Sequence, residues 1–499
     1  MEAFFIRALQ LILSLSILVF LHEFGHFFFA RVFKVRVDKF YMFFNPGFSL
    51  VRAKKINGKW QFRFFAKNVP ANERVKLDAD GDQMVDDKGR AVMEPIPMSD
   101  LPDNDWRKYP ETTEWGIGWL PLGGYCKIAG MIDESMDKTQ MALPPQKWEY
   151  RAKPVWQRLP IIIGGVFVNF ILALAIYAAI LFTWGQEYVP LKNAGYGLQF
   201  SETMKQYGFK NGDNIISIDG KPVEKSSDAV EEILINGKQN VLVQRDSQTV
   251  NIKLPADFTK KVLAAEESEI LAIRYPFVID VVNGGNPAAV AGLQSGDSLV
   301  SINGAQAAVY QDIVKILDAN KGKSIDVGFY RQGKLLNAKV NLNENGKLGV
   351  GLVTPNHFFK TNKIEYTFAE AIPAGISLGW ETLTSYAKSL KHIFSKQGVS
   401  SLGGFGAMGS MFPPVWIWEA FWGMTAMLSL VLAFMNFLPI PALDGGHVLF
   451  LLYEMITGKK PSEKFLENAQ GVGMILLLAL LVFANGNDLY RWISSLISK

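Results

Sequence analysis

An apolar run from Leu11 to Phe33 constrains the fold of this 499-residue chain more than any other feature. A stretch of this length and hydrophobicity is typical of a helix that spans a lipid bilayer. It nevertheless contains His22, Glu23 and His26. Ionisable side chains are costly to bury at membrane depth, so those that occur there usually serve a function.

The spacing of the two histidines favours a metal site. At 3.6 residues per turn, His22 and His26 lie one turn apart on the same helix face, where both rings can reach one ion. Glu23 follows directly and can act as general base, which is the H-E-x-x-H arrangement of zinc proteases. The alternative is that the histidines are packing residues with ordinary hydrogen bonds. Against it, the chain has only 5 histidines, and this single turn holds a pair of them.

The composition agrees with a chain that is partly embedded in a membrane and partly soluble. Hydrophobic residues make up 49% and aromatic residues 12%. The net charge of +4 is small and no dense basic stripe is present, so we expect no nucleic-acid partner. The single cysteine, Cys126, excludes an intrachain disulfide and a thiolate metal cluster. The first apolar run lacks the basic front and cleavage site of a signal peptide, so we expect it to be retained.

Charged residues predict the orientation of the membrane helices. Arg31, Lys34, Arg36 and Lys39 follow the first span closely, whereas only Arg7 precedes it. Positive residues favour the cytoplasmic side, so we expect the N terminus outside and the histidine pair in the cytoplasmic half of the membrane. Three further apolar stretches, 161–184, 416–438 and 471–484, bring the predicted number of spans to four, and both termini are then expected outside.

Residues 35–65 favour β-structure. Aromatic runs on either side of Asn57-Gly58 predict a hairpin, because Asn-Gly supports the tight turn between two strands. We expect a small β-sheet on the cytoplasmic membrane face; an ordinary soluble hairpin is the alternative. Gly123 and Gly124 predict a close approach of a strand to another element or to a bound peptide. Residues 68–114 are polar and acidic, and we expect a solvated insertion without chemistry.

An internal repeat lies between about residues 189 and 356. The segment 208–220 matches 292–304, and each contains a turn, a strand and a tight Asp-Gly or Asn-Gly turn. With Asn286-Pro287 in front, the second copy resembles a PDZ domain, and the shared core predicts two such domains. PDZ domains usually bind a peptide by adding it as a strand to a sheet edge, so peptides or proteins are expected ligands.

Three further segments accompany the later spans. Tyr366–Phe394 predicts a helix, interrupted at Pro373, whose polar content favours the outer membrane surface. Gly398–Met411 predicts a glycine-rich loop. Gly164 and Gly165 in the second span indicate either close helix packing or a role near the site.

A third metal ligand is expected near the C-terminal end of the chain. A catalytic zinc usually takes three protein ligands and leaves a fourth position for water. Asp444 is the best candidate, because it follows an apolar span on the same predicted side as the histidine pair. Pro439 and Pro441 break the helix there and free backbone for a site. Two alternatives stay open: Asp444-Gly445 as a plain turn, and His447 as the ligand.

These motifs resemble the site-2 protease family, and most closely its regulator-of-sigma-E protease (RseP-type) branch. The resemblance rests on residues 22–26, on Leu443-Asp444-Gly445 preceded by Asn436, and on PDZ-like repeats between the central spans. Known members are zinc intramembrane proteases of the bacterial inner membrane. They cut the membrane segment of anti-sigma factors after a first outer cleavage, and some clear signal-peptide remnants.

The resemblance implies a role for each candidate residue. His22, His26 and Asp444 would hold Zn²⁺, Glu23 would be the base, and single-pass membrane proteins would be the substrates. The resemblance also implies that Asn436 and Asn169 contact substrate. The strand at Gly123 and Gly124 is expected to contact substrate as well, because an unwound peptide needs a sheet edge as a partner.

Three features depart from the family pattern. Gly164-Gly165-Val166 stands where the family commonly has a Gly-Pro pair, and residues 68–114 are longer than expected. Gly403–Gly406 lacks the Ser-Gly-Pro often found there.

The expected fold class is a polytopic α-helical membrane protein with four transmembrane helices, a membrane-associated β-sheet and two extracytoplasmic PDZ domains. Two rival functions are a non-catalytic PDZ membrane scaffold and, less favoured, a metal transporter. The expected segments are the first transmembrane helix 1–34, the sheet 35–130, a cytoplasmic linker 131–160, the second transmembrane helix 161–185, PDZ domains 189–270 and 271–356, a membrane-surface helix and loop 364–411, the third transmembrane helix 416–447, a cytoplasmic loop 448–470, and the fourth transmembrane helix with the tail 471–499.

Overall fold

The computed structural model describes residues 2–68, 73–75, 84, 93–121, 123–131, 145–265, 267, 269–282, 284–393 and 403–497. The chain divides into two compact units. The first consists of Met1–Leu181, Phe368–Gly398 and Leu402–Asn485, and the second consists mainly of Phe182–Thr367.

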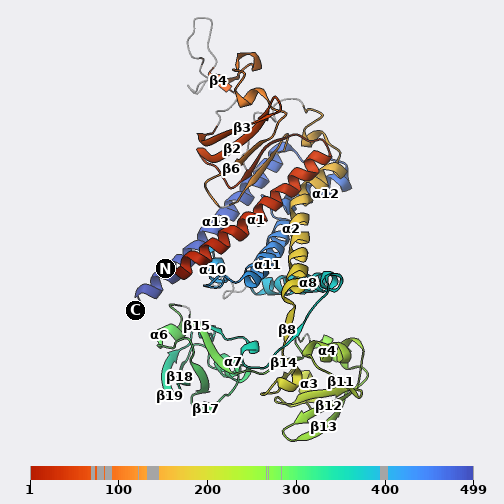
Figure 1. The fold of residues 1–499 in the computed structure, drawn as a ribbon, viewed down its shortest axis with the longest axis vertical. Helices are drawn as coiled ribbons and strands as arrows, with labels where there is room; N and C mark the ends of the chain where they lie inside the picture. Colours follow the sequence, from red (N-terminus) through yellow and green to blue (C-terminus); the bar gives the residue numbers. More distant parts are fainter. Residues whose placement is uncertain are drawn as a thin grey trace. The chain divides into compact units, whose positions relative to one another are not determined.

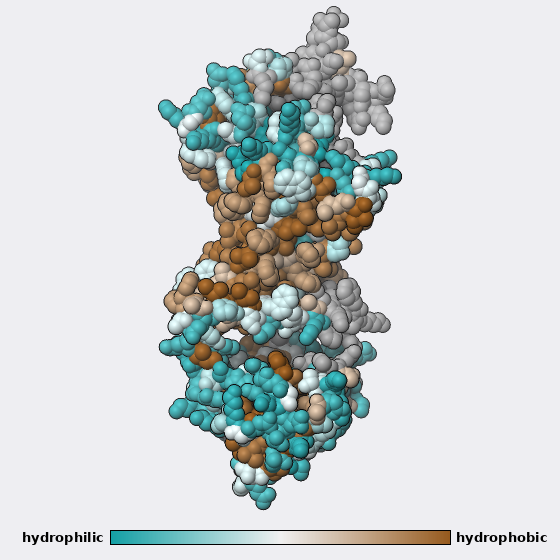
Figure 2. Space-filling model, turned by 90° about the vertical axis from the view of Figure 1, so that its right-hand side faces the viewer, coloured by the Kyte–Doolittle hydropathy of each residue, from teal (hydrophilic) through white to brown (hydrophobic). Residues whose placement is uncertain are grey.

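Four helices among the described residues are long and apolar enough to cross a membrane, as predicted. Their bounds are Glu2–Val32 for α1, Val155–Trp184 for α2, Trp418–Phe437 for α11 and Glu463–Ile497 for α13 (Figure 1). Figure 2 shows hydrophobic residues gathered over the helices of the first unit. Large apolar side chains such as Phe167, Ile475 and Val482 are exposed there. Such a surface suits contact with lipid rather than water.

The third predicted span is divided into two helices. Helix α11 ends at Phe437, and Asp444 begins a separate helix, α12 (Asp444–Thr457). Pro439 and Pro441 cannot donate a helical hydrogen bond, which explains the break. The segment 448–470, predicted as a cytoplasmic loop, is largely helical, because it contains most of α12 and the start of α13. Helix α12 is too short, and the start of α13 is too polar, for hydropathy to distinguish either from a loop.

Two expectations about the segment 364–411 are also corrected. Helix α8 (Phe368–Ile393) continues through Pro373 instead of being interrupted there. A proline near the helix start removes one backbone hydrogen bond. Helix α8 packs closely against α2 next to this proline, since a Cβ on Gly375 would lie 2.5 Å from the Ala178 nitrogen. The predicted glycine-rich loop contains a short helix, α10 (Phe405–Ser410). Residues 398–402 of that loop lie outside the described residues.

The predicted sheet and hairpin are present in the first unit. Five strands have the order β3-β2-β6-β1-β7, with only β1 and β6 parallel. Asn57 and Gly58 have φ values of 49° and 79°, as a two-residue hairpin turn requires. Strands β1 and β7 contact α1. The strands are β1 (Val37–Met42), β2 (Phe48–Ile56), β3 (Lys59–Lys67), β6 (Glu114–Ile117) and β7 (Tyr125–Ile128).

The insertion 68–114 is not wholly solvated, which corrects the prediction. Its described part includes strands β4 (Glu73–Val75) and β5 (Met93–Pro95) and two short 3-10 helices, Met98–Asp100 and Trp106–Lys108. Trp106 is buried, and its indole nitrogen donates to Gln61 of β3 at 2.9 Å. The last residues of the insertion therefore pack on the sheet, which a purely compositional argument could not reveal.

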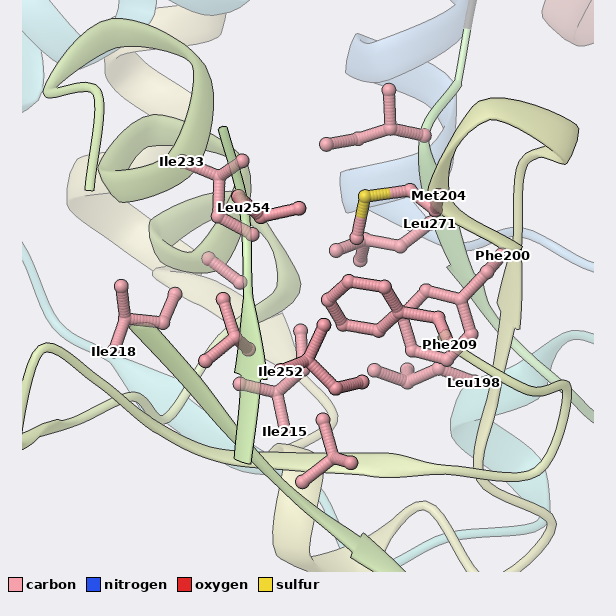
Figure 3. Packing of buried hydrophobic residues seen from close by; sticks show 14 of the residues in the cluster. Leu198, Phe200, Met204, Phe209, Ile215, Ile218, Ile233, Ile252, Leu254 and Leu271 are labelled. Carbon is pink, nitrogen blue, oxygen red and sulfur yellow. The ribbon is translucent and has the colours of Figure 1, made fainter. Parts of the chain in front are cut away.

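The second unit contains two folded repeats with separate cores. Figure 3 shows the first core, where the Phe200 and Phe209 rings pack with centroids 4.9 Å apart. The first repeat contains β9 (Leu198–Phe200), α3 (Glu202–Gln206), β10 (Asn214–Ile218), β11 (Lys221–Pro222), α4 (Ser226–Val230), β12 (Asn240–Arg245), β13 (Gln248–Lys253), α5 (Phe258–Ala264) and β14 (Leu271–Ile273). The second contains β15 (Phe277–Val282), α6 (Pro287–Val290), β16 (Ser298–Ile302), β17 (Ala305–Gln306), α7 (Tyr310–Ala319), β18 (Ser324–Arg331), β19 (Lys334–Asn341) and β20 (Val350–Leu352).

Each repeat contains an ion pair between a buried aspartate of the matching segment and a partly exposed arginine further along the chain. Asp213 pairs with Arg245 at 2.7 Å, and Asp297 pairs with Arg331 at 2.6 Å. Each aspartate also accepts a backbone N–H from three residues earlier. The predicted boundary at residue 270 is slightly early, because β14 pairs with β9 and so belongs to the first repeat.

A short pair of strands joins the two ends of the second unit. Strand β8 (Gln186–Tyr188) is antiparallel to β21 (Asn362–Ile364), with Tyr188 opposite Asn362. The chain segments that lead into the repeats and out of them are therefore hydrogen-bonded neighbours.

Helices α1 and α2 of the first unit meet at glycines. A Cβ on Gly25 would lie 2.2 Å from the Gly164 carbonyl oxygen, and a Cβ on Gly164 would lie 2.6 Å from the Gly25 carbonyl oxygen. A Cβ on Gly165 would lie 2.5 Å from Nε2 of His26. The sequence left open whether Gly164 and Gly165 serve packing or the site; both uses are present.

We predict that Gly25→Ala destabilises the helical unit. The new methyl would meet backbone, so the helices must separate, and such overpacking typically costs about 1–3 kcal/mol. The midpoint of thermal unfolding of the full chain in detergent should fall. Gly423→Ala in α11 is the matched control, because a Cβ there meets no atom within 4 Å. Equal midpoints for the two variants would contradict the prediction.

Candidate metal centre

Helix α1 brings His22 and His26 together as the spacing predicted. The two Nε2 atoms are 3.3 Å apart, and each residue is only 8% exposed. Both side chains are on one face of α1, where Gly165 of α2 packs against the rings. The absence of a side chain on Gly165 thus makes room for both imidazoles.

Asp444 reaches the same point from the far end of the chain. Its Oδ2 atom lies 3.3 Å from Nε2 of His22 and 3.4 Å from Nε2 of His26. The turn that leads to Asp444 is held by close packing, since a Cβ on Gly445 would lie 2.0 Å from the Leu438 carbonyl oxygen. The plain-turn alternative does not account for this convergence of three potential ligands.

The three atoms fit a tetrahedral zinc ion. Zinc bonds to histidine nitrogen and carboxylate oxygen are about 2.0–2.2 Å long. Two ligands at a tetrahedral angle are then separated by about 3.3–3.5 Å, which matches the observed 3.3, 3.3 and 3.4 Å. Oδ2 of Asp444 is buried and has no conventional hydrogen-bond partner among the described residues. A cation would satisfy this oxygen.

Helix α2 orients both imidazoles from behind. Nδ1 of His26 is 2.8 Å from the carbonyl oxygen of Ile161, so its N–H donates there and Nε2 keeps a lone pair for a metal. Nδ1 of His22 lies 3.3 Å from the side-chain amide of Asn169. The side-chain oxygen of Asn169, Oδ1, is buried without a partner among the described residues. A half-turn of the amide would let that oxygen accept the His22 Nδ1 proton.

The asparagines predicted to hold substrate lie on two sides of His22. Asn169 is fully buried, and its backbone oxygen accepts a hydrogen bond from Ser429. Asn436 is partly exposed, and its amide nitrogen is 3.4 Å from Nε2 of His22. Only Asn436 is therefore placed where it could contact both the metal-binding side of His22 and a bound substrate.

Gly123 and Gly124 precede β7 beside α1. A Cβ on Gly124 would lie 2.6 Å from the Tyr41 carbonyl oxygen, 2.9 Å from Val19 and 3.5 Å from Glu23. The close approach that the paired glycines predicted is therefore to another element of the protein. It brings the start of β7 next to the proposed base.

A cavity of about 90 Å³ connects these residues. Glu23 lines it together with the three potential ligands, and the backbone of Cys126 hydrogen-bonds to the Glu23 carboxylate. His447 lines the cavity but is not in the three-residue ligand group. The sequence analysis did not identify Tyr125 and Gln470 as residues of this site. A glutamine next to the apolar run of α13 was the signal that could have identified Gln470. The lining residues are His22, Glu23, His26, Tyr125, Cys126, Ile128, Met131, Ala442, Leu443, Asp444, His447 and Gln470.

A buried ion pair fixes α12 against α2. Nη2 of Arg158 donates to Oε1 of Glu454 at 2.5 Å, and both residues are buried. Asp444 is at the first position of the same α12 helix. This pair therefore helps hold the carboxylate-bearing helix beside the helix that orients the histidines.

We predict that Asp444→Asn lowers the metal content of the purified protein. An amide is a weaker ligand than a carboxylate and removes one negative charge from the site. Zinc retained after dialysis against a weak chelator, measured by atomic emission, should fall by about tenfold or more. The exposed Asp280→Asn variant should retain wild-type zinc; full metal content in Asp444→Asn would exclude this ligand.

Comparison with known proteins agrees with this geometry. The model of peptidase family M50 matches residues 10–68 and 105–480. The Regulator of sigma E protease of Haemophilus influenzae is 26% identical over 508 residues, covering 96% of this chain and 98% of the relative. A protein of Ralstonia nicotianae, provisionally named a zinc metalloprotease, is 26% identical over 77% of this chain and 88% of its own length. Metalloprotease MmpA of Caulobacter vibrioides is 25% identical, covering 76% of this chain and 83% of the relative. The resemblance to site-2 proteases is thus confirmed, and the chain belongs to peptidase family M50.

Proposed function

We propose that the chain is a zinc metalloprotease that hydrolyses peptide bonds within membrane-spanning segments of other proteins. The observation that carries the proposal is the convergence of His22, His26 and Asp444 beside Glu23 in one small cavity. The zinc-metalloprotease name of a relative supports Zn²⁺ as the cofactor. When bound, Zn²⁺ supplies Lewis-acid chemistry that makes water a better nucleophile and polarises the scissile carbonyl.

Glu23 is the proposed general base. Its carboxylate accepts a proton from the attacking water while the water oxygen bonds to the peptide carbonyl carbon. It then gives the proton to the departing nitrogen as the C–N bond breaks, so the products are a carboxylic acid and an amine, and the acid then passes its proton to the amine. The hydrogen bond from the Cys126 backbone would hold Glu23 in position for both transfers.

The substrate must leave its helical form before cleavage. A peptide bond in a membrane helix is protected by its own hydrogen bonds, and an unwound backbone needs new partners. Strand β7 is suited to this role, because its residues Tyr125, Cys126 and Ile128 line the cavity. We assign the segment from Gly123 to β7 as the surface along which the substrate lies, and the amide of Asn436 as a clamp.

The membrane setting follows from the four apolar helices. Helix α1 carries the histidines and is itself a candidate span. The exposed apolar residues of α8, Phe368, Ile372, Ile376 and Trp380, recur every four residues, which suits a helix at the membrane surface. With the positive-inside rule, the proposal places the protein in the bacterial inner membrane with the site near the cytoplasmic face.

The two repeats of the second unit are proposed to be extracytoplasmic PDZ domains. The support is their shared sequence core and the matching Asp213–Arg245 and Asp297–Arg331 pairs. In this proposal they exclude substrates whose outer domain is still intact, so cleavage follows a first cut by another protease. The substrates would be single-pass membrane proteins such as anti-sigma factors, or signal-peptide remnants.

Glu23→Gln should abolish cleavage and retain zinc. The amide cannot accept the water proton, and loss of a general base typically lowers kcat by about 10²–10⁴-fold. The assay is cleavage of a model transmembrane peptide by the purified full chain, with metal analysis of the same samples. Cleavage at the wild-type rate would refute the role of Glu23. Absence of zinc from wild type and variant alike would favour the PDZ scaffold, whereas zinc carried across vesicles without cleavage would favour the transporter.

Deleting residues 190–356 should relax substrate selection. The deletion retains β8 and β21, whose hydrogen-bonded ends can be rejoined by a short linker. Cleavage of a substrate with a bulky folded outer domain should increase severalfold, while cleavage of the trimmed substrate should change little. Deletion of the first repeat alone serves as the intermediate case. Unchanged selectivity in the full deletion would contradict the gating proposal.

A further inference from the structure

A second cavity lies at the base of the insertion, on the sheet of the first unit. It has a volume of about 230 Å³. Its lining carries four cationic side chains, Arg52, Arg63, Lys67 and Arg107, with Asn68, Asn104 and Asp105. The family model matches the chain up to residue 68 and again from residue 105. The cavity therefore forms where a segment outside the family model joins the shared fold.

Two arginines face each other directly across this part of the sheet. Arg52 of β2 is the register partner of Arg63 of β3. Like charges directly opposite each other destabilise a strand pair unless a counter-charge is nearby. Arg63 is fixed by its stacking on Trp106, 4.3 Å from the ring centroid, and by donation to the Asn104 carbonyl at 3.1 Å. These contacts hold the Arg63 charge in place without neutralising it.

Arg52 is a buried cation whose Nε atom has no hydrogen-bond partner among the described residues. It is 3% exposed, and its Nη2 donates to the Lys67 carbonyl at 2.7 Å. The carboxylate of Glu114 is 3.8 Å away and also accepts a hydrogen bond from Tyr41 at 2.5 Å. Buried charges are strongly destabilising unless they are paired and hydrogen-bonded. A ligand with negative charge would improve this balance.

The acidic residue in the cavity lining, Asp105, is already paired with Arg107. Asp105 binds Arg107 through two carboxylate contacts, 2.7 Å to Nη2 and 3.1 Å to Nε. Within the described part of the chain, neither Arg63 nor Lys67 has a carboxylate within ion-pair distance. Among the described lining residues, positive charges therefore outnumber negative charges.

We propose that this cavity binds a phosphate group, either free phosphate or the phosphate of an anionic lipid headgroup. Planar guanidinium groups offer paired N–H donors that match phosphate oxygens, and lysine adds a point charge. One water occupies about 30 Å³ in the liquid, so the cavity has room for a phosphate and several waters. The bound group would bridge β2, β3 and the returning end of the insertion. This proposal is independent of the proteolytic function.

The test compares phosphate-dependent stability of charge variants of the full chain in detergent. The unfolding midpoint is measured with increasing sodium phosphate, against sodium chloride at equal ionic strength. Wild type should be stabilised, and the concentration for half of the effect should rise by about tenfold or more in Arg63→Gln/Lys67→Gln. Lys59→Gln, an exposed lysine on the same hairpin, is the matched control and should behave as wild type. Wild-type zinc content of each variant reports that the helical unit is folded.

A second arm distinguishes the two sources of phosphate. Short-chain phosphatidylglycerol is compared with the zwitterionic phosphatidylcholine of equal chain length. Stabilisation by phosphatidylglycerol alone indicates a lipid headgroup, and stabilisation by inorganic phosphate indicates a free anion; either result supports the site. No stabilisation by either probe, or equal stabilisation of wild type and the double variant, would overturn it.

The acidic part of the insertion provides a further check. In one variant its aspartates are replaced by asparagine. If phosphate stabilises this variant but not wild type, the insertion's own carboxylates are the native occupant, and the phosphate proposal fails. The replaced residues are Asp78, Asp80, Asp82, Asp86 and Asp87.

Discussion

Three buried atoms with lone pairs, held 3.3–3.4 Å apart, are the feature on which the rest of the structure depends. Such atoms repel unless a proton or a cation lies between them. The residues that carry these atoms belong to α1 and α12, and the two helices are separated by about 400 residues of sequence. In a bilayer, apolar contact between helices gains little over contact with lipid, so close packing and hydrogen bonds must hold the helices together.

Small residues provide this packing at each crossing that matters for the site. Gly25 and Gly164 let α1 and α2 touch through their backbones, and Gly165 makes room for the imidazoles. At the other ligand, a Cβ on Gly446 would lie 2.6 Å from the Ile440 carbonyl oxygen. The two residues that follow Asp444 must therefore be glycines for steric reasons, because the turn before α12 packs against the start of that helix where the carboxylate is presented. The Arg158–Glu454 pair adds a polar contact between α2 and α12.

Much of the site could be predicted from sequence because its signals are local or chemically rare. The i, i+4 histidines need only the helical repeat, and Asp444 is conspicuous at the end of an apolar span. Asn169 was recognised only as a substrate contact, although it lies buried behind His22. Its position depends on the rotation of α2 relative to α1, which a single sequence does not encode locally. Gln470 was missed for the same reason.

The fold shows a similar division between local and tertiary signals. The hairpin at Asn57-Gly58 and the four apolar helices were predicted, since turn chemistry and hydropathy specify them directly. Helix α12 and the continuity of α8 through Pro373 were not, because tertiary packing outweighs the proline and the short helix length. The burial of Trp106 contradicts the acidic composition around it. Composition describes the average of a segment and not its anchoring residue.

The pairing of β8 with β21 has a consequence for how this protein could have been assembled and altered. Because the two ends of the repeat-bearing segment are adjacent strands, that segment resembles a cassette inserted at one point of a pre-existing chain. Its content can be lengthened, shortened or exchanged without pulling on either flanking helix. Selection acting on the two repeats could then proceed separately from selection acting on the helical unit.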